Sequence, residues 1–347
     1  MFVKSYKIVA PRRFEVYIEE IVNKEGEAVV AIDTAAICKA DLRYYLGNRE
    51  KRILDLKYPM NLLHEAVGYV IKDKTGTFNV GDRVVLVPNL IIECDENCLH
   101  KVCKIPELGE NYCPMARFAS SNYNGFSRAA LSYPVRNLVM VPANIPSPVS
   151  VFSELISVAN SIVRRIKWND EGIIAIWGDG VLGYILCCVL KLVMKSKVLV
   201  VGKHYDKMEM FPADVFYHVD DPSIKNENFT VAVECVGGNN AEKAINSIID
   251  NIVPGGKIVL SGVTESKVPI NTRKILEKGI TIYGVTRSNI QDFIKGIEYL
   301  KNEKFMRNIS RLIIDEYKVN NIEDYYRVFE KEAINQKLGK YVIKFIF

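Results

Sequence analysis

The fold of this 347-residue chain is indicated by one stretch near its middle, Gly178-Asp179-Gly180-Val181-Leu182-Gly183. An apolar run, residues 173–177, precedes the stretch, and a second apolar run, residues 184–194, follows it. A strand, a tight glycine turn and a helix in this order are the context of a dinucleotide-binding fingerprint. We expect Gly178 to make the turn, Gly180 to let the backbone approach a pyrophosphate, and Gly183 to let the helix pack on the strand. The stretch therefore predicts that residues 178–183 bind a dinucleotide.

Strands and helices alternate after this turn. We expect further strands at residues 197–202, 215–219, 230–236, 257–261 and 280–285, and helices at 241–252, 272–278 and 289–301. Strands interleaved with helices are typical of a doubly wound parallel sheet. The sequence therefore predicts an α/β protein with a Rossmann dinucleotide-binding domain over residues 151–302.

The first 150 residues follow a different pattern. Short strand-like runs at residues 27–33, 66–71 and 82–87 are joined by turns rich in glycine, asparagine and aspartate, and no long helix separates them. This pattern predicts a β-rich domain over residues 1–150, and a group of prolines at 142–148 marks its end. Residues 340–347 again resemble a strand, which could return to the first domain.

Composition limits the classes of function. A hydrophobic content of 49% and a charged content of 25% describe a soluble globular protein of about two domains. The net charge of +5 is not concentrated in a stripe of lysine and arginine, so we expect no nucleic-acid partner. The sequence shows no signal peptide and no apolar run long enough to cross a bilayer. We therefore expect a cytoplasmic protein that does not bind a membrane.

The end of the second predicted strand indicates which dinucleotide fits. Gly202 is followed by Lys203 and His204, with Lys207 close behind. An NAD site usually has an acidic residue here, which binds the ribose 2′-hydroxyl. Because that acid is missing and cations are present, we expect NADPH rather than NADH. Ordinary surface lysines would explain Lys203 and Lys207 but not the missing acid.

The first domain contains candidate metal ligands. Cys38 lies in Ile-Cys-Lys-Ala-Asp, His64 and Glu65 lie in Leu-His-Glu-Ala-Val-Gly, and Glu154 follows the prolines. A thiolate, an imidazole and carboxylates that leave one position open form a catalytic zinc site. Taken alone, His64 could be an ordinary core or surface residue and Glu154 a first-turn helix acid. Their combination with a dinucleotide fold favours a zinc site.

These motifs resemble the zinc-dependent medium-chain dehydrogenases over essentially the whole chain. The order is Cys-x-x-Asp at 38–41, His-Glu-x-x-Gly at 64–68, and then the glycine-rich nucleotide fold. The carboxylate at 154, where alcohol dehydrogenases carry cysteine, resembles the polyol and sugar branch of the family. Five shorter stretches resemble the enzymes of that branch that serve teichoic-acid and capsule biosynthesis; they are residues 10–16, 41–45, 176–180, 234–238 and 271–273.

The resemblance implies the architecture and the roles of individual residues. A GroES-like catalytic domain, formed by residues 1–150 and completed by 303–347, would surround the inserted Rossmann domain. Cys38, His64 and Glu154 would bind the catalytic zinc, Glu65 would ligate it or exchange with water, and Asp41 would orient His64.

The sequence departs from the family at two positions next to these residues. Leu63 stands where the family often has glycine, and Ala40 stands where many relatives have a serine or threonine that relays a proton. The proton path therefore stays open between water, Glu65 and a hydroxyl of the cofactor.

The implied reaction is the reduction of ribulose 5-phosphate to ribitol 5-phosphate, with zinc as a Lewis acid and NADPH as the hydride donor. Arginines suit the substrate phosphate, and the candidates are Arg43, with Tyr44 beside it, and Arg287. Arg49 is equally well explained as a surface residue. The resemblance further implies that a cytidylyltransferase partner takes up the product to make CDP-ribitol, and that the protein is a homo-oligomer.

The cysteines divide into two groups. Cys94, Cys98, Cys103 and Cys113 resemble the structural-zinc lobe of the family, although their spacing is wider. Four thiolates can form a closed tetrahedral zinc site; a metal-free lobe, or a site with His100 as a ligand, stays open as an alternative. The others apart from Cys38 are Cys187, Cys188 and Cys235, which we expect to be buried as small hydrophobic residues.

Two other functions stay open. The chain could be a related polyol or alcohol dehydrogenase that acts on an unphosphorylated sugar alcohol, although Arg43 and Arg287 favour a phosphorylated substrate. It could also be a binding protein that keeps the fold and the nucleotide without turnover. The complete set of Cys38, His64 and the two glutamates argues against that third class.

Overall fold

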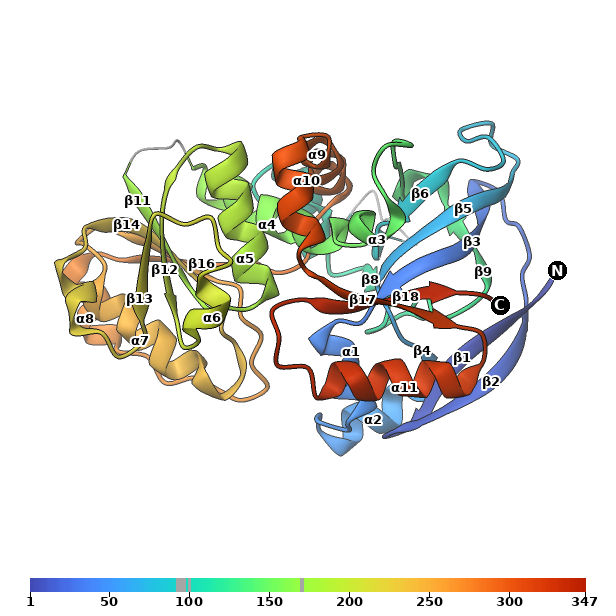
Figure 1. The fold of residues 1–347 in the computed structure, drawn as a ribbon, viewed down its shortest axis with the longest axis horizontal. Helices are drawn as coiled ribbons and strands as arrows, with labels where there is room; N and C mark the ends of the chain where they lie inside the picture. Colours follow the sequence, from blue (N-terminus) through green and yellow to red (C-terminus); the bar gives the residue numbers. More distant parts are fainter. Residues whose placement is uncertain (92–97, 99–100, 169–171) are drawn as a thin grey trace. The chain divides into compact units, whose positions relative to one another are not determined.

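The computed structural model describes residues 1–91, 98, 101–168 and 172–347, and it divides the chain into two compact units (Figure 1). The first unit contains Met1–Glu154, Ser288–Lys301 and Ile309–Phe347. The second unit contains Leu155–Arg287 and Asn302–Asn308. We describe each unit by itself.

The second unit is built on a parallel sheet. Its six strands are β11 (Ile173–Trp177), β12 (Lys197–Gly202), β13 (Val215–His218), β14 (Phe229–Glu234), β15 (Lys257–Leu260) and β16 (Thr281–Gly284). The order is β13-β12-β11-β14-β15-β16, and every neighbouring pair is parallel. This order is that of a Rossmann dinucleotide-binding fold, so the predicted fold class is confirmed.

Helices connect these strands, as expected for parallel pairs. They are α5 (Val181–Cys188), α6 (Tyr205–Met208), α7 (Ala241–Asn251) and α8 (Thr272–Lys278), and α4 (Ser153–Ile166) precedes the first of these strands. The buried face of α7 joins the apolar side chains of the central strands in one core, which includes Ala175, Ala232 and Ile248. The predicted strands and helices of this unit lie within two residues of their predicted limits, with one exception. The helix after the fingerprint is α-helical only as far as Cys188 and continues as a short π-helix, Val189–Val193.

The first unit is rich in β-structure, as predicted. Its largest sheet has the order β10-β6-β5-β3-β18-β17, with β9 also paired to β3. A second sheet has the order β2-β1-β4, and β7 pairs with β8. The strands are β1 (Phe2–Ala10), β2 (Arg13–Glu20), β3 (Glu27–Ala36), β4 (Met60–Asn61), β5 (Glu65–Asp73), β6 (Arg83–Leu86), β7 (Asn89–Ile91), β8 (Ala116–Phe118), β9 (Ala130–Pro134), β10 (Leu138–Met140), β17 (Ile313–Val319) and β18 (Lys340–Phe345).

The helices of the first unit are short apart from α9 and α11. They are α1 (Lys39–Tyr45), α2 (Lys51–Lys57), α3 (Ser147–Ser150), α9 (Ile290–Leu300) and α11 (Ile322–Ala333), and α10 (Glu303–Ser310) passes from the second unit back to the first. In the part of the chain that the structure describes, no helix has the length and apolar character needed to cross a membrane.

The C-terminal strand returns to the first unit, as the sequence predicted. Strand β18 pairs antiparallel with β3, with Val342 opposite Ala36 and Lys344 opposite Thr34. Figure 1 shows β18, in red, beside β3, in blue. Segments at opposite ends of the chain thus form the same sheet.

The units differ from the predicted domain limits at three segments. Residues 151–154 and the α9 segment, Ser288–Lys301, group with the first unit, whereas we expected them in the Rossmann domain. Asn302–Asn308 groups with the second unit, although most of it was assigned to the first domain. Helix α9 forms its own capping box at Asn289 and Asp292, so its existence is encoded locally, but the unit it packs against is not.

Candidate metal and cofactor sites

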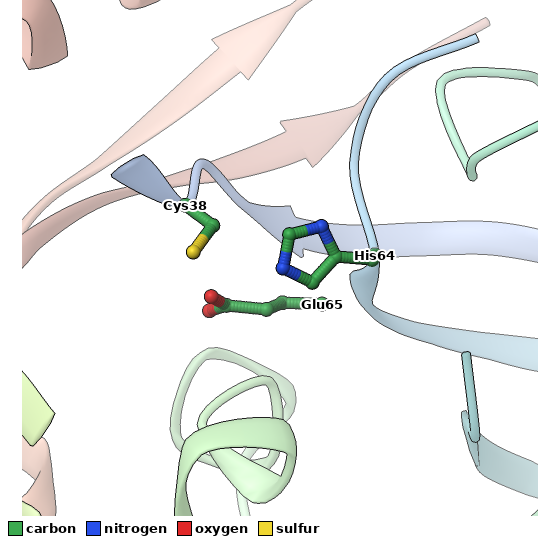
Figure 2. Close-up of side chains that lie close together, drawn as sticks. All are labelled: Cys38, His64 and Glu65. Atoms are coloured by element: carbon green, nitrogen blue, oxygen red, sulfur yellow. The ribbon is translucent and has the colours of Figure 1, made fainter. Parts of the chain in front are cut away.

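Cys38, His64 and Glu65 form the one group of three potential metal ligands in the described residues, with ligand atoms within 4.8 Å of one another. Figure 2 shows the thiol, one ring nitrogen and the carboxylate directed toward a common point. The sheet creates this arrangement, because Ala36 on β3 lies opposite Glu65 on β5. Cys38 follows β3 directly, at the start of α1, so the antiparallel pairing places the three side chains together.

Asp41 supports this group from α1. Its buried carboxylate accepts the backbone N–H groups of Cys38 (2.9 Å) and Leu63 (3.1 Å) and the hydroxyl of Ser120. Its Oδ1 lies 3.5 Å from Nδ1 of His64. Burial opposes the charged form of Asp41, but His64 and these donors outweigh burial and lower the pKa of the carboxyl. Asp41 therefore lies on the Nδ1 side of His64, and the opposite ring nitrogen faces Cys38 and Glu65 (Figure 2); its orienting role stays a prediction.

The pKa of His64 is raised. Burial would favour the neutral ring, but the charge of Asp41 and the neighbouring Cys38 stabilise the protonated form more strongly. A metal ion requires the neutral imidazole and the thiolate, so metal binding here releases protons.

Leu63 explains why the family often has glycine before the His-Glu pair. Its φ is 73°, in the left-handed region that side chains with a Cβ rarely occupy. The leucine side chain is completely buried in the core of the first unit. The departure noted in the sequence therefore keeps the backbone turn and adds a buried side chain to it.

Lys340 was not identified from the sequence, and it is the nearest charged partner of the group. Its Nζ forms an ion pair with Oε1 of Glu65, and both side chains are buried, at 5% and 0% exposed. The other carboxylate oxygen, Oε2 of Glu65, is buried and has no hydrogen-bond partner among the described residues. A thiol, an imidazole and a carboxylate whose ligand atoms lie within 4.8 Å of one another are a donor set that fits a zinc ion.

Glu154 lies close to this group but outside the set of three. It occupies the first turn of α4 and is 6% exposed. Burial raises its pKa to about 7, and the charges of His64, Glu65 and Lys340 also act on it. These influences place it near the candidate ligands, and its role as a zinc ligand stays a prediction.

The glycines of the fingerprint lie where the sequence predicted, between β11 and α5. Gly178 has a φ of 125° and passes close to the backbone of Cys235. A Cβ on Gly183 would lie 2.3 Å from the carbonyl oxygen of Gly178, whereas a Cβ on Gly180 would meet nothing within 4 Å. Gly183 thus permits close packing of helix and strand, and Gly180 leaves open space at the start of α5, where Val181 and Leu182 follow.

Asp179 has a structural role at the second strand. Its carboxylate accepts the backbone N–H groups of Lys203 (2.9 Å) and His204 (2.7 Å), and it lies 2.8 Å from Nδ1 of His204. It thereby holds the turn after Gly202 that carries the predicted 2′-phosphate ligands, Lys203 and Lys207. The sequence shows that β12 is not followed by an acid, but it does not show that an acid from the glycine turn, Asp179, binds this backbone.

The predicted substrate residues are distributed over both units. Arg43 lies on α1 and is half-buried, and Arg287 follows β16 in the second unit with a φ of 60°. Tyr44 is only 2% exposed, so its ring belongs to the core rather than to an open surface. The guanidinium of Arg49 lies 4.3 Å from the centre of that ring, which makes Arg49 more than an isolated surface residue.

The structure tests the predictions for the two groups of cysteines to different extents. Cys94 lies outside the described residues, as does His100. Cys98, Cys103 and Cys113 are free thiols and do not belong to any group of three ligands within the described residues, so the structural zinc site stays a prediction. Cys187 and Cys188 are buried as predicted, whereas Cys235 is only partly buried, because it lies at the end of β14 beside the glycine turn.

Comparisons with known proteins agree with this architecture. The family model of the alcohol dehydrogenase GroES-like domain matches residues 24–143, and that of the zinc-binding dehydrogenase domain matches residues 190–302. Ribulose-5-phosphate reductase of Bacillus spizizenii is 37% identical over 99% of each chain. Ribulose-5-phosphate reductase 1 of Staphylococcus aureus is 36% identical over 100% of each chain.

A solved structure also resembles this chain over its full length. The crystal structure of S. aureus TarJ in complex with NADPH matches with a TM-score of 0.86 and 32% identity, and the match covers 100% of both chains. The fold, the Cys38–His64–Glu65 group and the full-length sequence identity lead to one conclusion: the chain belongs to the zinc-dependent medium-chain dehydrogenases, in the group of the ribulose-5-phosphate reductases.

Proposed function

We propose that this protein reduces D-ribulose 5-phosphate to D-ribitol 5-phosphate with NADPH in a zinc-dependent reaction. The observation that carries this proposal is full-length identity of 34–37% to three proteins named ribulose-5-phosphate reductase, combined with the Cys38–His64–Glu65 group. The structural neighbour with bound NADPH, which aligns over the whole chain, supports the choice of cofactor.

Each unit supplies one part of this chemistry. Bound zinc would polarise the C2 carbonyl and stabilise the alkoxide, and NADPH would donate the hydride. Cys38 and His64 would hold the metal, and Asp41 would orient the ring of His64. Glu154 is the third proposed ligand, because it is a buried carboxyl on which the charges of His64 and Glu65 act.

Cations are proposed to select the phosphorylated substrate and cofactor. Arg43 and Arg287 are suited to the substrate phosphate, because a guanidinium binds two phosphate oxygens at once. Tyr44 contributes indirectly, since its buried ring supports Arg49. Lys203 and Lys207 are proposed to bind the 2′-phosphate of NADPH, on the turn that Asp179 holds.

The wider setting follows from the group to which the chain belongs. We propose that the ribitol 5-phosphate formed here passes to a cytidylyltransferase, which makes CDP-ribitol for teichoic-acid or capsule synthesis. The homo-oligomeric state and the cytoplasmic location expected from the sequence stay predictions.

The test is oxidation of NADPH followed by its absorbance, with ribulose 5-phosphate or unphosphorylated ribulose, before and after treatment with a zinc chelator. We expect turnover of the phosphate ester that the chelator abolishes and zinc restores. Equal turnover of both ketoses would move the protein to the polyol dehydrogenases that act on free sugars. Tight NADPH binding without turnover of either ketose would instead indicate a binding protein.

A matched pair of variants tests the substrate residues. R43A removes a proposed phosphate ligand, and we expect its KM for ribulose 5-phosphate to rise at least tenfold while its NADPH affinity is kept. K51A, on the neighbouring helix α2, removes an exposed cation that pairs with Asp55 and serves as the control. Equal effects of both substitutions would show that only general surface charge matters.

A further inference from the structure

We infer that Lys340 positions Glu65 at the zinc site: it holds this carboxylate away from the metal and so keeps one coordination position open for the substrate oxygen. The inference rests on the zinc site of the proposed function, and it assigns a role to a residue that lies 275 positions from Glu65 in the sequence. Lys340 is a positioning residue, since it acts through Glu65.

The contact between the two side chains is enclosed by protein. Lys340 begins β18, and its backbone N–H donates to the carbonyl of Leu312 at 2.8 Å, so the strand fixes where the side chain starts. Its Nζ ends at Oε1 of Glu65, and neither side chain is more than 7% exposed. A buried charge is tolerated only when it is paired, so the ammonium and the carboxylate depend on one another.

The two oxygens of Glu65 have different surroundings. Oε1 accepts from Lys340, whereas Oε2 is buried without a hydrogen-bond partner among the described residues. A ligand atom of this carboxylate lies within 4.8 Å of the ligand atoms of Cys38 and His64 (Figure 2). The carboxylate therefore lies within reach of a metal that Cys38 and His64 would hold, and the ion pair with Lys340 opposes its movement onto that metal.

The surrounding charges explain why a cation is needed at this position. The groups that act on Lys340 are Glu65, Cys38 and Glu332, and each of them carries or can carry a negative charge. Glu332 is itself fixed, because its carboxylate accepts the backbone N–H of Tyr341 at 2.9 Å. Without the Lys340 ammonium, the zinc ion would be the cation nearest to the Glu65 carboxylate. Glu65 would then bind the zinc at the coordination position that is otherwise open.

The variant K340M removes the charge and keeps an unbranched side chain. Its matched control is K344M on the same strand, because Lys344 also forms an ion pair, with Asp33, but that pair is partly exposed. E65Q removes the charge that Lys340 is proposed to hold, and K340M/E65Q removes both charges together. K340R keeps a cation at the site.

The measurement uses the visible spectrum of the Co²⁺-substituted protein, taken as a difference against C38S so that cobalt bound elsewhere is subtracted. Four-coordinate Co²⁺ absorbs much more strongly than five-coordinate Co²⁺. We expect a weaker spectrum for K340M, together with zinc release to a chelator that is about tenfold slower than in the wild type. K344M, K340R and E65Q should keep the wild-type spectrum, and K340M/E65Q should regain it.

Two results would overturn the inference. One is a K340M spectrum and zinc release rate equal to those of the wild type or of K344M. The other, which holds even if K340M fails to fold, is a changed spectrum in E65Q, because it would show that Glu65 already ligates the metal beside Lys340. These measurements need no substrate, so a protein that fails to reduce ribulose 5-phosphate would contradict the proposed function and still test the role of Lys340. Absence of any Cys38-dependent cobalt spectrum would overturn both.

Discussion

At Leu63 the backbone and the hydrophobic core have opposite requirements. A φ of 73° is unfavourable for a residue with a Cβ, by about 1–2 kcal/mol. Complete burial of a leucine side chain stabilises the fold by roughly 1.5–3 kcal/mol. Burial compensates for the strained backbone, which explains how the chain keeps leucine where the family often has glycine.

At position 63 glycine should give a more stable protein than alanine, the reverse of their usual order of stability. We expect L63A to lose about 2–5 kcal/mol in the free energy of unfolding, because it removes buried methyl groups and keeps the strained φ. L63G should be more stable than L63A by about 1 kcal/mol, because glycine adopts the left-handed region freely. Urea unfolding of both variants measures this difference; a less stable L63G would show that the backbone at this position is not strained.

Asp41 should matter for metal affinity as well as stability. Its carboxylate accepts from Cys38, Leu63 and Ser120 and lies beside His64, and an amide would present a donor to groups that are themselves donors. We expect D41N to bind zinc about 10- to 100-fold more weakly, measured by competition with a chromophoric chelator. D33N, which breaks a partly exposed ion pair on β3, is the control, and an equal loss there would contradict the orienting role of Asp41.

Whether the sequence could identify a residue of the candidate site depends on whether a local motif encodes it. Cys38, His64 and Glu65 belong to local motifs, and their combination with a dinucleotide fold indicated them as candidate ligands; the structure brings the three together. Lys340 becomes part of the site only because β18 pairs with β3, next to β5, and no local pattern encodes that pairing. The role of Asp179 depends in the same way on the pairing of β11 with β12.

At the scale of elements, two glycines of the turn between β11 and α5 lack a side chain for different reasons. Gly183 lies against the carbonyl of Gly178, so its lack of a side chain serves packing. Gly180 faces open space, so packing does not require its lack of a side chain, and we predict that a ligand approaches the backbone there. One motif thus combines a requirement of the fold with a requirement of binding.

Alanine substitutions should separate these two requirements. We expect G183A to destabilise the protein by about 1–3 kcal/mol or more, because the new Cβ overlaps backbone. G180A should change stability by less than about 1 kcal/mol but weaken NADPH binding at least about tenfold, equivalent to about 1.4 kcal/mol. Thermal unfolding and NADPH titration measure the two effects. Unchanged NADPH affinity in G180A would argue against pyrophosphate binding at this turn.

Helix α11 should make a pH-dependent contribution to stability through Glu330. A hydrogen bond from Tyr45 (2.5 Å) and the guanidinium of Arg12 (2.7 Å) lower the pKa of Glu330 below its usual value near 4.3. A lowered pKa stabilises the fold above the unfolded-state value, and this contribution is lost as the pH falls through the folded-state value. The stability difference between wild type and E330Q should therefore be constant above about pH 5 and shrink below about pH 4.

The control for Glu330 lies on the same helix. Glu323 is exposed and 3.9 Å from Arg327, so E323Q should show little effect at any pH. Urea unfolding at several pH values distinguishes the two residues. A difference between wild type and E330Q that does not change with acidification would contradict the proposed interaction.

Some elements were easier to predict than others for physical reasons. The strands of the parallel sheet are nearly continuous apolar runs, because both faces are covered, and such runs stand out in a sequence. The hairpin of β1 and β2 was not predicted, since Val16 (49% exposed) and Ile18 (67% exposed) face outward and obscure the alternation typical of a strand. Helix α1 is only seven residues long and begins at Lys39, so its signal was too short to recognise.

At the scale of the whole molecule, two separate cores carry two separate tasks. The first unit, which holds the candidate zinc ligands, is assembled from three segments of the chain, and the second carries the nucleotide turn. The sequence predicted both units and the return of the C-terminus, because each part has its own periodicity. It placed α9 in the wrong unit, because the amphipathic pattern of a helix shows that it packs but not on which neighbour.

The central claim is that this protein transfers hydride from NADPH to C2 of ribulose 5-phosphate at a zinc site. The most direct test incubates the zinc-loaded protein with NADPH that carries deuterium at both hydrogen positions of C4 and identifies the product by mass spectrometry and NMR. The account predicts ribitol 5-phosphate with one deuterium at C2, formed by the wild type and not by C38S or the chelated protein. A product without deuterium at C2, or equal labelling of unphosphorylated ribulose, would contradict it.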